Sequence, residues 1–141
     1  MPEGLTADAY MDAHVDALEQ FAREMPADIL AHPTLIPQSL RALDAEELWT
    51  EEREERVIAA LSAAGIAFEI SSRYPPHERL VQRAVDRGVR ISLGSDGHTA
   101  TDVADLTRPL ALAGALGIAP LDLYDPTRHG SKTQTVGQPH A

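Results

Sequence analysis

The sequence predicts an α/β domain in which about three parallel strands are covered by helices. Three short apolar runs, at residues 28–32, 66–70 and 89–93, alternate with longer segments of helical periodicity. The chain has 141 residues, of which 43% are hydrophobic and 24% charged, and this composition is typical of one globular domain. We expect residues 1–124 to form this domain and residues 125–141 to be a flexible C-terminal tail.

The first half of the chain contains two helical patterns and one strand. Apolar residues recur at helical spacing over residues 6–23 and stop before a proline. The strand at 28–32 comes next and ends in histidine. Asp44 then has the sequence context of a helix N-cap, with a glutamate three residues later, and we expect one helix from there to a stop at Gly65.

Two further helices follow the second and third strands. Two consecutive prolines, Pro75 and Pro76, begin the first of them, and Gly88 ends it. The second is a helical pattern over residues 103–116, which Pro109 interrupts. Strands that alternate with helices in this way pair in parallel, because each helix returns the chain to the end of the sheet where the next strand begins.

Polar side chains with metal-binding chemistry follow the strands at their carboxyl ends. His32 ends the first strand, residues 71–73 follow the second, and Asp96 and His98 follow the third. These carboxyl ends meet at one edge of a parallel sheet, where ligands of such folds bind. In an extended segment, residues i and i+2 project to the same side, so Asp96 and His98 can face one cation or two neighbouring cations. The sequence has no cysteine, so His, Asp and Glu must hold any metal.

Each candidate also has a purely structural interpretation. Asp96 can cap a turn and leave His98 in solvent, and His32 can be a buried histidine bonded to a carbonyl group. Arg73 can bind a substrate phosphate through its two-pronged guanidinium group, or it can be an ordinary surface arginine. Glu69 lies within a strand, where an unpaired carboxylate is costly to bury, so we expect it to orient a neighbouring group.

Three segments of the chain resemble the PHP superfamily of metal-dependent phosphoesterases, named for polymerase and histidinol phosphatase. They are Asp-Ile-Leu-Ala-His-Pro at 28–33, Phe-Glu-Ile-Ser at 68–71 and Gly-Val-Arg-Ile-Ser-Leu-Gly-Ser-Asp-Gly-His at 88–98. The resemblance covers about residues 27–117. It implies a partial (β/α) barrel, because this family folds as a distorted seven-stranded barrel and the chain matches its C-terminal half.

The resemblance also implies the chemistry of the site. It makes His32, Asp96 and His98 metal ligands, with Asp96 and His98 as the catalytic residues and Glu69 as an acidic group that does not bind the metal. The implied activity is that of a hydrolase, a histidinol phosphatase-like phosphoesterase that acts on a small phosphorylated substrate with divalent Mn, Zn or Fe. The alternative is a non-catalytic remnant or fragment that binds a metal or a small anion.

The chain lacks the family's N-terminal half of the site. That half begins with a His-x-His motif, and no such motif occurs among the six histidines of this sequence. A barrel of this kind takes roughly 200 residues or more, so we expect a truncated gene product, a fragment, or a chain that a partner completes. Open strand edges and uncovered apolar side chains favour association. We therefore expect a homo-oligomer, or a partner that supplies the missing half of the barrel.

Composition and charge exclude several classes of function. The formal net charge is −10 and no cluster of Lys and Arg is present, which argues against nucleic-acid binding. No apolar run approaches the ~20 residues that span a bilayer, and no secretion signal begins the sequence, so we expect no membrane contact and a cytoplasmic protein. Among the other histidines, we expect His14 to be a hydrogen-bonded packing residue and His77 to be solvated, and we expect the acidic run 46–55 to be a solvated helix face.

Overall fold

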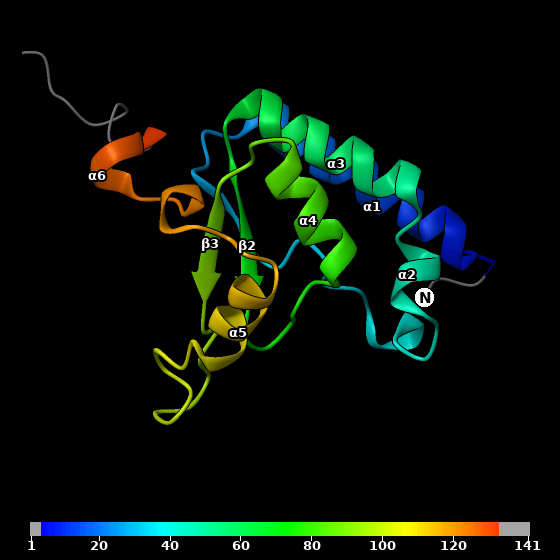
Figure 1. Cartoon of the computed structure of the whole chain (residues 1–141). Helices are drawn as coiled ribbons and strands as arrows, with labels where there is room; N and C mark the ends of the chain where they lie inside the picture. Colours follow the sequence, from blue (N-terminus) through cyan, green and yellow to red (C-terminus); the bar gives the residue numbers. More distant parts are fainter. Residues whose placement is uncertain (1–3, 133–141) are drawn as a thin grey trace, which may run out of the picture.

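The computed structural model describes residues 4–132, which form one sheet of parallel strands flanked by helices (Figure 1). The strands are β1 (Ile29–Leu30), β2 (Ala67–Ser71) and β3 (Ile91–Gly94). The longer helices are α1 (Ala7–Glu24), α3 (Glu51–Ala64), α4 (Glu78–Asp86) and α5 (Thr107–Ala115), and the short ones are η1 (Gln38–Leu40), α2 (Ala45–Leu48), η2 (Pro120–Asp122) and α6 (Pro126–His129). No helix in this part of the chain is long and apolar enough to cross a membrane.

The sheet has the strand order β1-β2-β3, and both pairs of neighbours are parallel. Leu30 of β1 lies opposite Phe68 of β2, and Phe68 lies opposite Ile91 of β3. Leu123 adds an isolated parallel bridge to Ile91 at the outer edge of β3. The predicted α/β class, with three parallel strands and covering helices, is therefore confirmed. Over residues 4–132 the sheet is open and shows no barrel.

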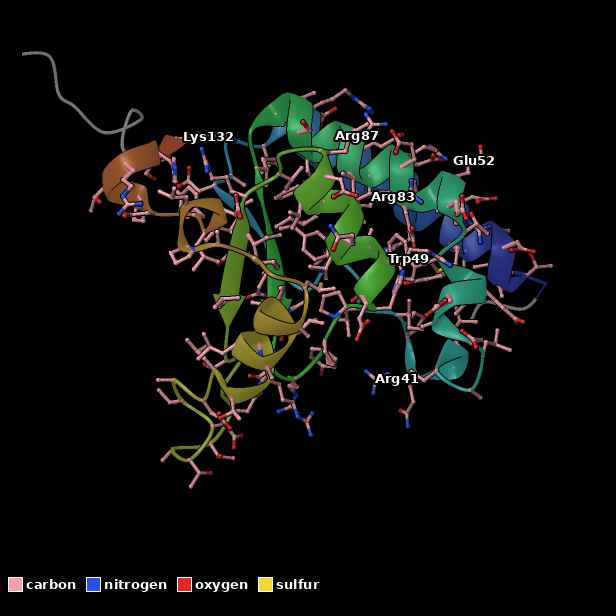
Figure 2. All side chains as sticks on the ribbon, viewed as in Figure 1. Arg41, Trp49, Glu52, Arg83, Arg87 and Lys132 are labelled. Atoms are coloured by element: carbon pink, nitrogen blue, oxygen red, sulfur yellow. The ribbon has the colours of Figure 1, made fainter. Side chains whose placement is uncertain are left out.

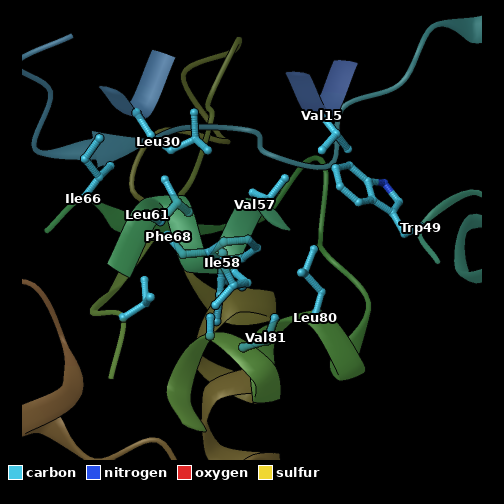
Figure 3. Close-up of a cluster of buried hydrophobic side chains, with 14 of the residues drawn as sticks. Val15, Leu30, Trp49, Val57, Ile58, Leu61, Ile66, Phe68, Leu80 and Val81 are labelled. Atoms are coloured by element: carbon cyan, nitrogen blue, oxygen red, sulfur yellow. The ribbon is translucent and has the colours of Figure 1, made fainter. Parts of the chain in front are cut away.

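The hydrophobic core lies between the sheet and the helices α1, α3 and α4 (Figure 3). Phe68 and Ile70 of β2 are fully buried there, together with Leu61 of α3 and Val81 of α4. Burying an apolar side chain of this size contributes roughly 1.5–3 kcal/mol. Since successive residues of a strand point to opposite faces, Glu69 is directed away from the layer that holds Phe68 and Ile70.

Side-chain caps set the beginnings of the first three α-helices. Thr6, Asp44 and Thr50 each accept a main-chain N–H from the first turn of α1, α2 and α3 respectively. The prediction of a single helix from Asp44 to Gly65 is wrong. Trp49 leaves the helical region, with φ −92° and ψ 76°, and is only 1% exposed. The helix α2 therefore ends at Leu48, and Thr50 caps the new helix α3.

His14 of α1 has the packing role that the sequence predicts. Its ring stacks on Tyr10, with 6.1 Å between centroids, and meets the edge of Trp49 at 5.8 Å. Burial lowers the pKa of the His14 imidazole, and the contact with the Pro33 carbonyl oxygen at 3.5 Å opposes this effect. The prediction of a hydrogen-bonded packing histidine is confirmed.

Glu54 of α3 joins this helix to α4 through a buried carboxylate. The side chain is completely buried, and it accepts hydrogen bonds from His77 at 2.5 Å, Arg79 at 3.0 Å and Arg83 at 3.1 Å. Burial alone would raise the pKa of the Glu54 carboxyl, but the bonds from Arg79 and His77 outweigh burial and hold this pKa below its ordinary value. The predictions of a solvated His77 and of a wholly solvated acidic run are wrong, because both ignore this pairing.

The predicted C-terminal tail lies partly outside the described residues, which end at Lys132. Within them, Asp125 caps α6 by accepting the N–H of Thr127. The ammonium group of Lys132 donates hydrogen bonds to the carbonyl oxygens of Ala64, at 2.7 Å, and Gly65, at 3.1 Å. These contacts place a cation at the C-terminus of α3, where the helix dipole favours positive charge.

Candidate functional site

The loops after the three strands lie at one edge of the sheet. Because the strands are parallel, their carboxyl ends meet there, at the lower end of the sheet in Figure 1. The structure brings His32, Glu69 and Asp96 into contact at this edge. His98 lies beside Asp96, and Arg73 lines a cavity next to it. All five predicted site residues are therefore neighbours.

His32 and Asp96 form the centre of this cluster. His32 follows β1 and Asp96 follows β3, and 3.6 Å separates His32 Nε2 from Asp96 Oδ1. Both residues have left-handed backbone conformations, with φ 51° for His32 and φ 48° for Asp96. Residues other than glycine rarely adopt this conformation, which costs on the order of 1–3 kcal/mol and is concentrated at functional sites. The surrounding structure holds both residues in this conformation.

Glu69 lies between the loop of His32 and strand β3. Its Oε2 accepts the main-chain N–H of His32 at 3.0 Å and lies 3.1 Å from His32 Nδ1. Its other oxygen lies against the Cα of Gly94, so that a Cβ at this position would overlap Glu69 Oε1. A glycine at residue 94 therefore leaves the space in which the Glu69 carboxylate reaches His32.

His98 lies on the exposed side of Asp96. Its Nδ1 is 2.8 Å from the main-chain oxygen of Asp96 and 3.7 Å from Asp96 Oδ1. Because a carbonyl oxygen only accepts hydrogen bonds, we assign the proton to Nδ1, which leaves the lone pair of Nε2 available. Metal-binding histidines commonly donate one ring N–H to a carbonyl or carboxylate group in this way. The His98 side chain is 57% exposed.

Two buried polar atoms of the cluster, His32 Nδ1 and Asp96 Oδ2, have no hydrogen-bond partner within residues 4–132. Nδ1 is close to Glu69 Oε2, but that oxygen already accepts the N–H of His32, and the ring nitrogen makes no hydrogen bond to it. A buried polar atom without a partner costs about 1–3 kcal/mol. A bound ligand can remove such a cost.

The donor set fits a transition-metal ion. Imidazole nitrogen and carboxylate oxygen are the ligands that Zn, Mn and Fe sites use in the absence of cysteine. His32 and His98 both approach Oδ1 of Asp96, so the three side chains form a row centred on this carboxylate. Over residues 4–132, no group of three or more His, Asp or Glu side chains is arranged to hold a metal ion.

A cavity of about 220 Å³ opens beside Asp96. Positively charged, negatively charged and hydroxyl side chains line this cavity. They come from the loop after β2, the loop after β3 and the first turn of α5, and they are Ser72, Arg73, Ser95, Asp96, Asp102, Asp105 and Arg108. Positive and negative groups therefore meet in one small space. Such a lining suits a polar, charged ligand rather than an apolar one.

Tyr74 connects Arg73 with His32. Arg73 Nε donates a hydrogen bond to the phenol oxygen of Tyr74 at 3.3 Å, and its Cζ is 5.8 Å from the ring centroid. The same ring meets the His32 imidazole edge-on, with 5.6 Å between centroids. The bond to Tyr74 raises the pKa of the Arg73 guanidinium, so this group keeps its positive charge at the edge of the cavity.

The sequence analysis missed Tyr74, Gly94 and Arg108 as members of this region. Tyr74 and Arg108 follow the carboxyl ends of β2 and β3, and this placement was a usable signal in the sequence. Gly94 has an ordinary φ, so no backbone signal marks it, and its importance comes from the Glu69 side chain on the neighbouring strand.

The chain matches no protein-family model, and neither the curated proteins nor the solved structures include one that is detectably similar to it.

Proposed function

We propose that this chain is a metal-dependent phosphoesterase of the PHP type, with its centre at the carboxyl edge of the sheet. The observation that carries the proposal is the meeting of His32 and Asp96. These residues come from loops far apart in the sequence, both have left-handed backbones, and each has a buried polar atom with no partner in the described part of the chain. The resemblance of residues 28–33, 68–71 and 88–98 to that superfamily supports the same assignment.

His32, Asp96 and His98 would hold a divalent Mn, Zn or Fe ion. Such an ion, when bound, activates water and offsets the negative charge of the phosphate oxygens. Glu69 positions His32, because it binds the main-chain N–H and lies beside the ring nitrogen of this histidine. The residues of the cavity beside Asp96 would then bind the substrate.

Arg73 would bind the phosphate of a small phosphorylated substrate in the cavity beside Asp96. Its guanidinium group is permanently charged and presents parallel N–H donors to two oxygens at once. Ser72 and Ser95 add hydroxyl groups to the same cavity. Asp96 lines the same cavity and His98 lies beside Asp96, so the ester bond would be hydrolysed next to them.

We propose that the open three-stranded parallel sheet is the C-terminal half of a (β/α) barrel. Parallel sheets are normally covered on both faces and have few exposed edges. We infer that a second copy of the chain, or a partner chain, supplies further strands and the His-x-His ligands that this sequence lacks. Light scattering of the purified protein should therefore give a dimer or a larger assembly, and a stable monomer would contradict this part of the proposal.

The second candidate is a non-catalytic protein that binds a metal or a small anion at the same edge. One observation favours binding without catalysis: among the described residues, no group of three or more His, Asp or Glu side chains is arranged to hold a metal ion. The two candidates differ in turnover, since only the phosphoesterase releases phosphate.

Hydrolysis of p-nitrophenyl phosphate tests the proposal. The purified protein should hydrolyse it when Mn²⁺ is added and stop when EDTA removes the ion. His98→Ala should lower the rate at least about tenfold, while His129→Ala, which changes a histidine of α6, should leave it unchanged. Absence of metal-dependent hydrolysis in the wild-type protein would favour the non-catalytic candidate.

A further inference from the structure

Five of the eleven arginines of this protein make no ion pair within residues 4–132, and three of these five lie at the carboxyl edge of the sheet. Six of the eleven are within ion-pair distance of Asp or Glu side chains, and most of these pairs join helices α1, α3 and α4; the six are Arg53, Arg56, Arg79, Arg83, Arg87 and Arg128. The chain has 22 acidic residues, so carboxylates are abundant. An arginine that makes no ion pair with any of them in the described chain therefore calls for an explanation.

Three arginines without an ion pair inside the described chain gather at the carboxyl edge of the sheet. Arg73 and Arg108 line the cavity beside Asp96, and Arg41 lies close to Tyr74. Figure 2 shows Arg41 at the lower end of the molecule, toward which β2 and β3 also point. Asp96, Asp102 and Asp105 line the same cavity as Arg73 and Arg108, whereas Arg41 is not part of this lining.

Tyr74 brings two of these three arginines together. The Cζ atoms of Arg41 and Arg73 lie 5.7 Å and 5.8 Å from the centre of its ring. The two arginines come from different loops, one after η1 and the other after β2.

We propose that Arg41 and Tyr74 form a second anion subsite beside the cavity, and that the ligand of this site carries a second anionic group besides its phosphate. This inference rests on the proposed function, in which Arg73 binds the phosphate. The Cζ atoms of both guanidinium groups lie within 5.8 Å of the centre of the Tyr74 ring, which places Arg41 next to the residue that binds the phosphate in the proposed function. The second group is a carboxylate or a second phosphate, because both accept the paired N–H donors of an arginine.

Two probes that differ by one charged group test this subsite. Methylphosphonate has a single phosphonate, and phosphonoacetate adds a carboxylate to it. Both are titrated by calorimetry into the full-length wild-type protein, in EDTA so that no metal contributes to binding, and sodium acetate is titrated alone to separate carboxylate binding from the combined effect. Arg41→Met is the test variant. Arg128→Met is the control, because Arg128 is an exposed arginine of α6.

The wild-type protein should bind phosphonoacetate at least tenfold more tightly than methylphosphonate. Arg41→Met should remove this preference and keep the affinity for methylphosphonate, while Arg128→Met should keep both. Equal affinity for the two probes in the wild type, a preference that survives in Arg41→Met, or no binding of phosphonoacetate would overturn the inference.

These outcomes are separate from those of the proposed function. If phosphonoacetate is preferred but no metal-dependent hydrolysis occurs, the anion subsite stands and the phosphoesterase proposal fails. If hydrolysis occurs and depends on metal but the two probes bind equally, the phosphoesterase proposal stands and the subsite at Arg41 does not exist. The titrations are done in a buffer without sulfate or phosphate, so competition by these anions cannot explain equal affinity for the two probes.

Discussion

Replacing Glu54 by glutamine should weaken the contact between α3 and α4 and lower the free energy of unfolding. Glu54 is completely buried and accepts hydrogen bonds from His77, Arg79 and Arg83. Glutamine keeps the shape of the side chain but removes its charge, and its amide N–H groups would face donors of the surrounding cations. At least one of the guanidinium N–H groups that Glu54 binds then loses this acceptor, although Arg79 keeps its hydrogen bond to the Trp49 carbonyl oxygen.

The structure sets the size of this effect. Breaking a buried ion pair by removing one partner costs about 3–5 kcal/mol. Arg79 and Arg83 are 35% and 25% exposed, so water replaces part of the lost bonding. We therefore expect a loss of about 2–3 kcal/mol in the free energy of unfolding, since partial exposure screens these pairs. For a chain of this length the melting temperature should fall by roughly 10 °C.

The pH dependence gives a second readout. Because the folded-state pKa of Glu54 is below its ordinary value, its contribution to stability is fully present above about pH 4.3 and is lost as the pH falls through the lower folded-state pKa. The difference in stability between the wild type and Glu54→Gln should thus be constant near neutral pH and shrink only in acid.

Urea denaturation followed by the fluorescence of Trp49 measures this difference, because Trp49 is the single tryptophan and is buried. Glu52→Gln is the matched control, since Glu52 lies on the same helix and points into solvent (Figure 2). We expect it to change the free energy of unfolding by no more than about 0.5 kcal/mol. If Glu54→Gln is as stable as Glu52→Gln, our interpretation of the buried cluster is wrong.

Three further substitutions test other parts of the structure. Gly94→Ala should displace the Glu69 carboxylate and thereby shift the NMR resonances of the His32 ring, which this carboxylate contacts. Unchanged His32 resonances would refute the steric argument. Thr50→Ala should remove the cap of α3 and cost about 1 kcal/mol in urea denaturation, and no loss would show that the cap is dispensable. Arg73→Met should raise the phenol pKa of Tyr74 toward about 10 in an absorbance titration, whereas an unchanged pKa would exclude the contact.

Much of the fold could be predicted because its signals are local. Alternating apolar runs and turn residues located all three strands, and polar residues such as Thr6 and Asp44 marked helix beginnings. The break at Trp49 was missed because Asp44 was taken as the only helix beginning in this segment, although Thr50, a residue type that caps helices, begins α3. His77 was misjudged because its partner Glu54 lies on a different helix, and contacts between helices leave no local signal in the sequence.

The candidate site was predictable in position and less so in detail. Parallel strand order requires the loops after the strands to share one edge, so the meeting of His32 with Asp96 followed from topology. The contact of Glu69 with His32 depends on space left by Gly94, and the approach of Arg41 to this edge depends on the path of a long loop. Neither leaves a pattern in the sequence.

Binding of Mn²⁺ tests the central claim most directly. The wild-type protein, His32→Gln and the control His129→Gln are titrated with Mn²⁺, and the free ion is measured by electron paramagnetic resonance. We predict saturable binding by the wild type and the control, and affinity weaker by about tenfold or more in His32→Gln. Absence of binding by the wild type, or equal binding by all three proteins, would contradict the assignment of His32 and Asp96 to a metal centre.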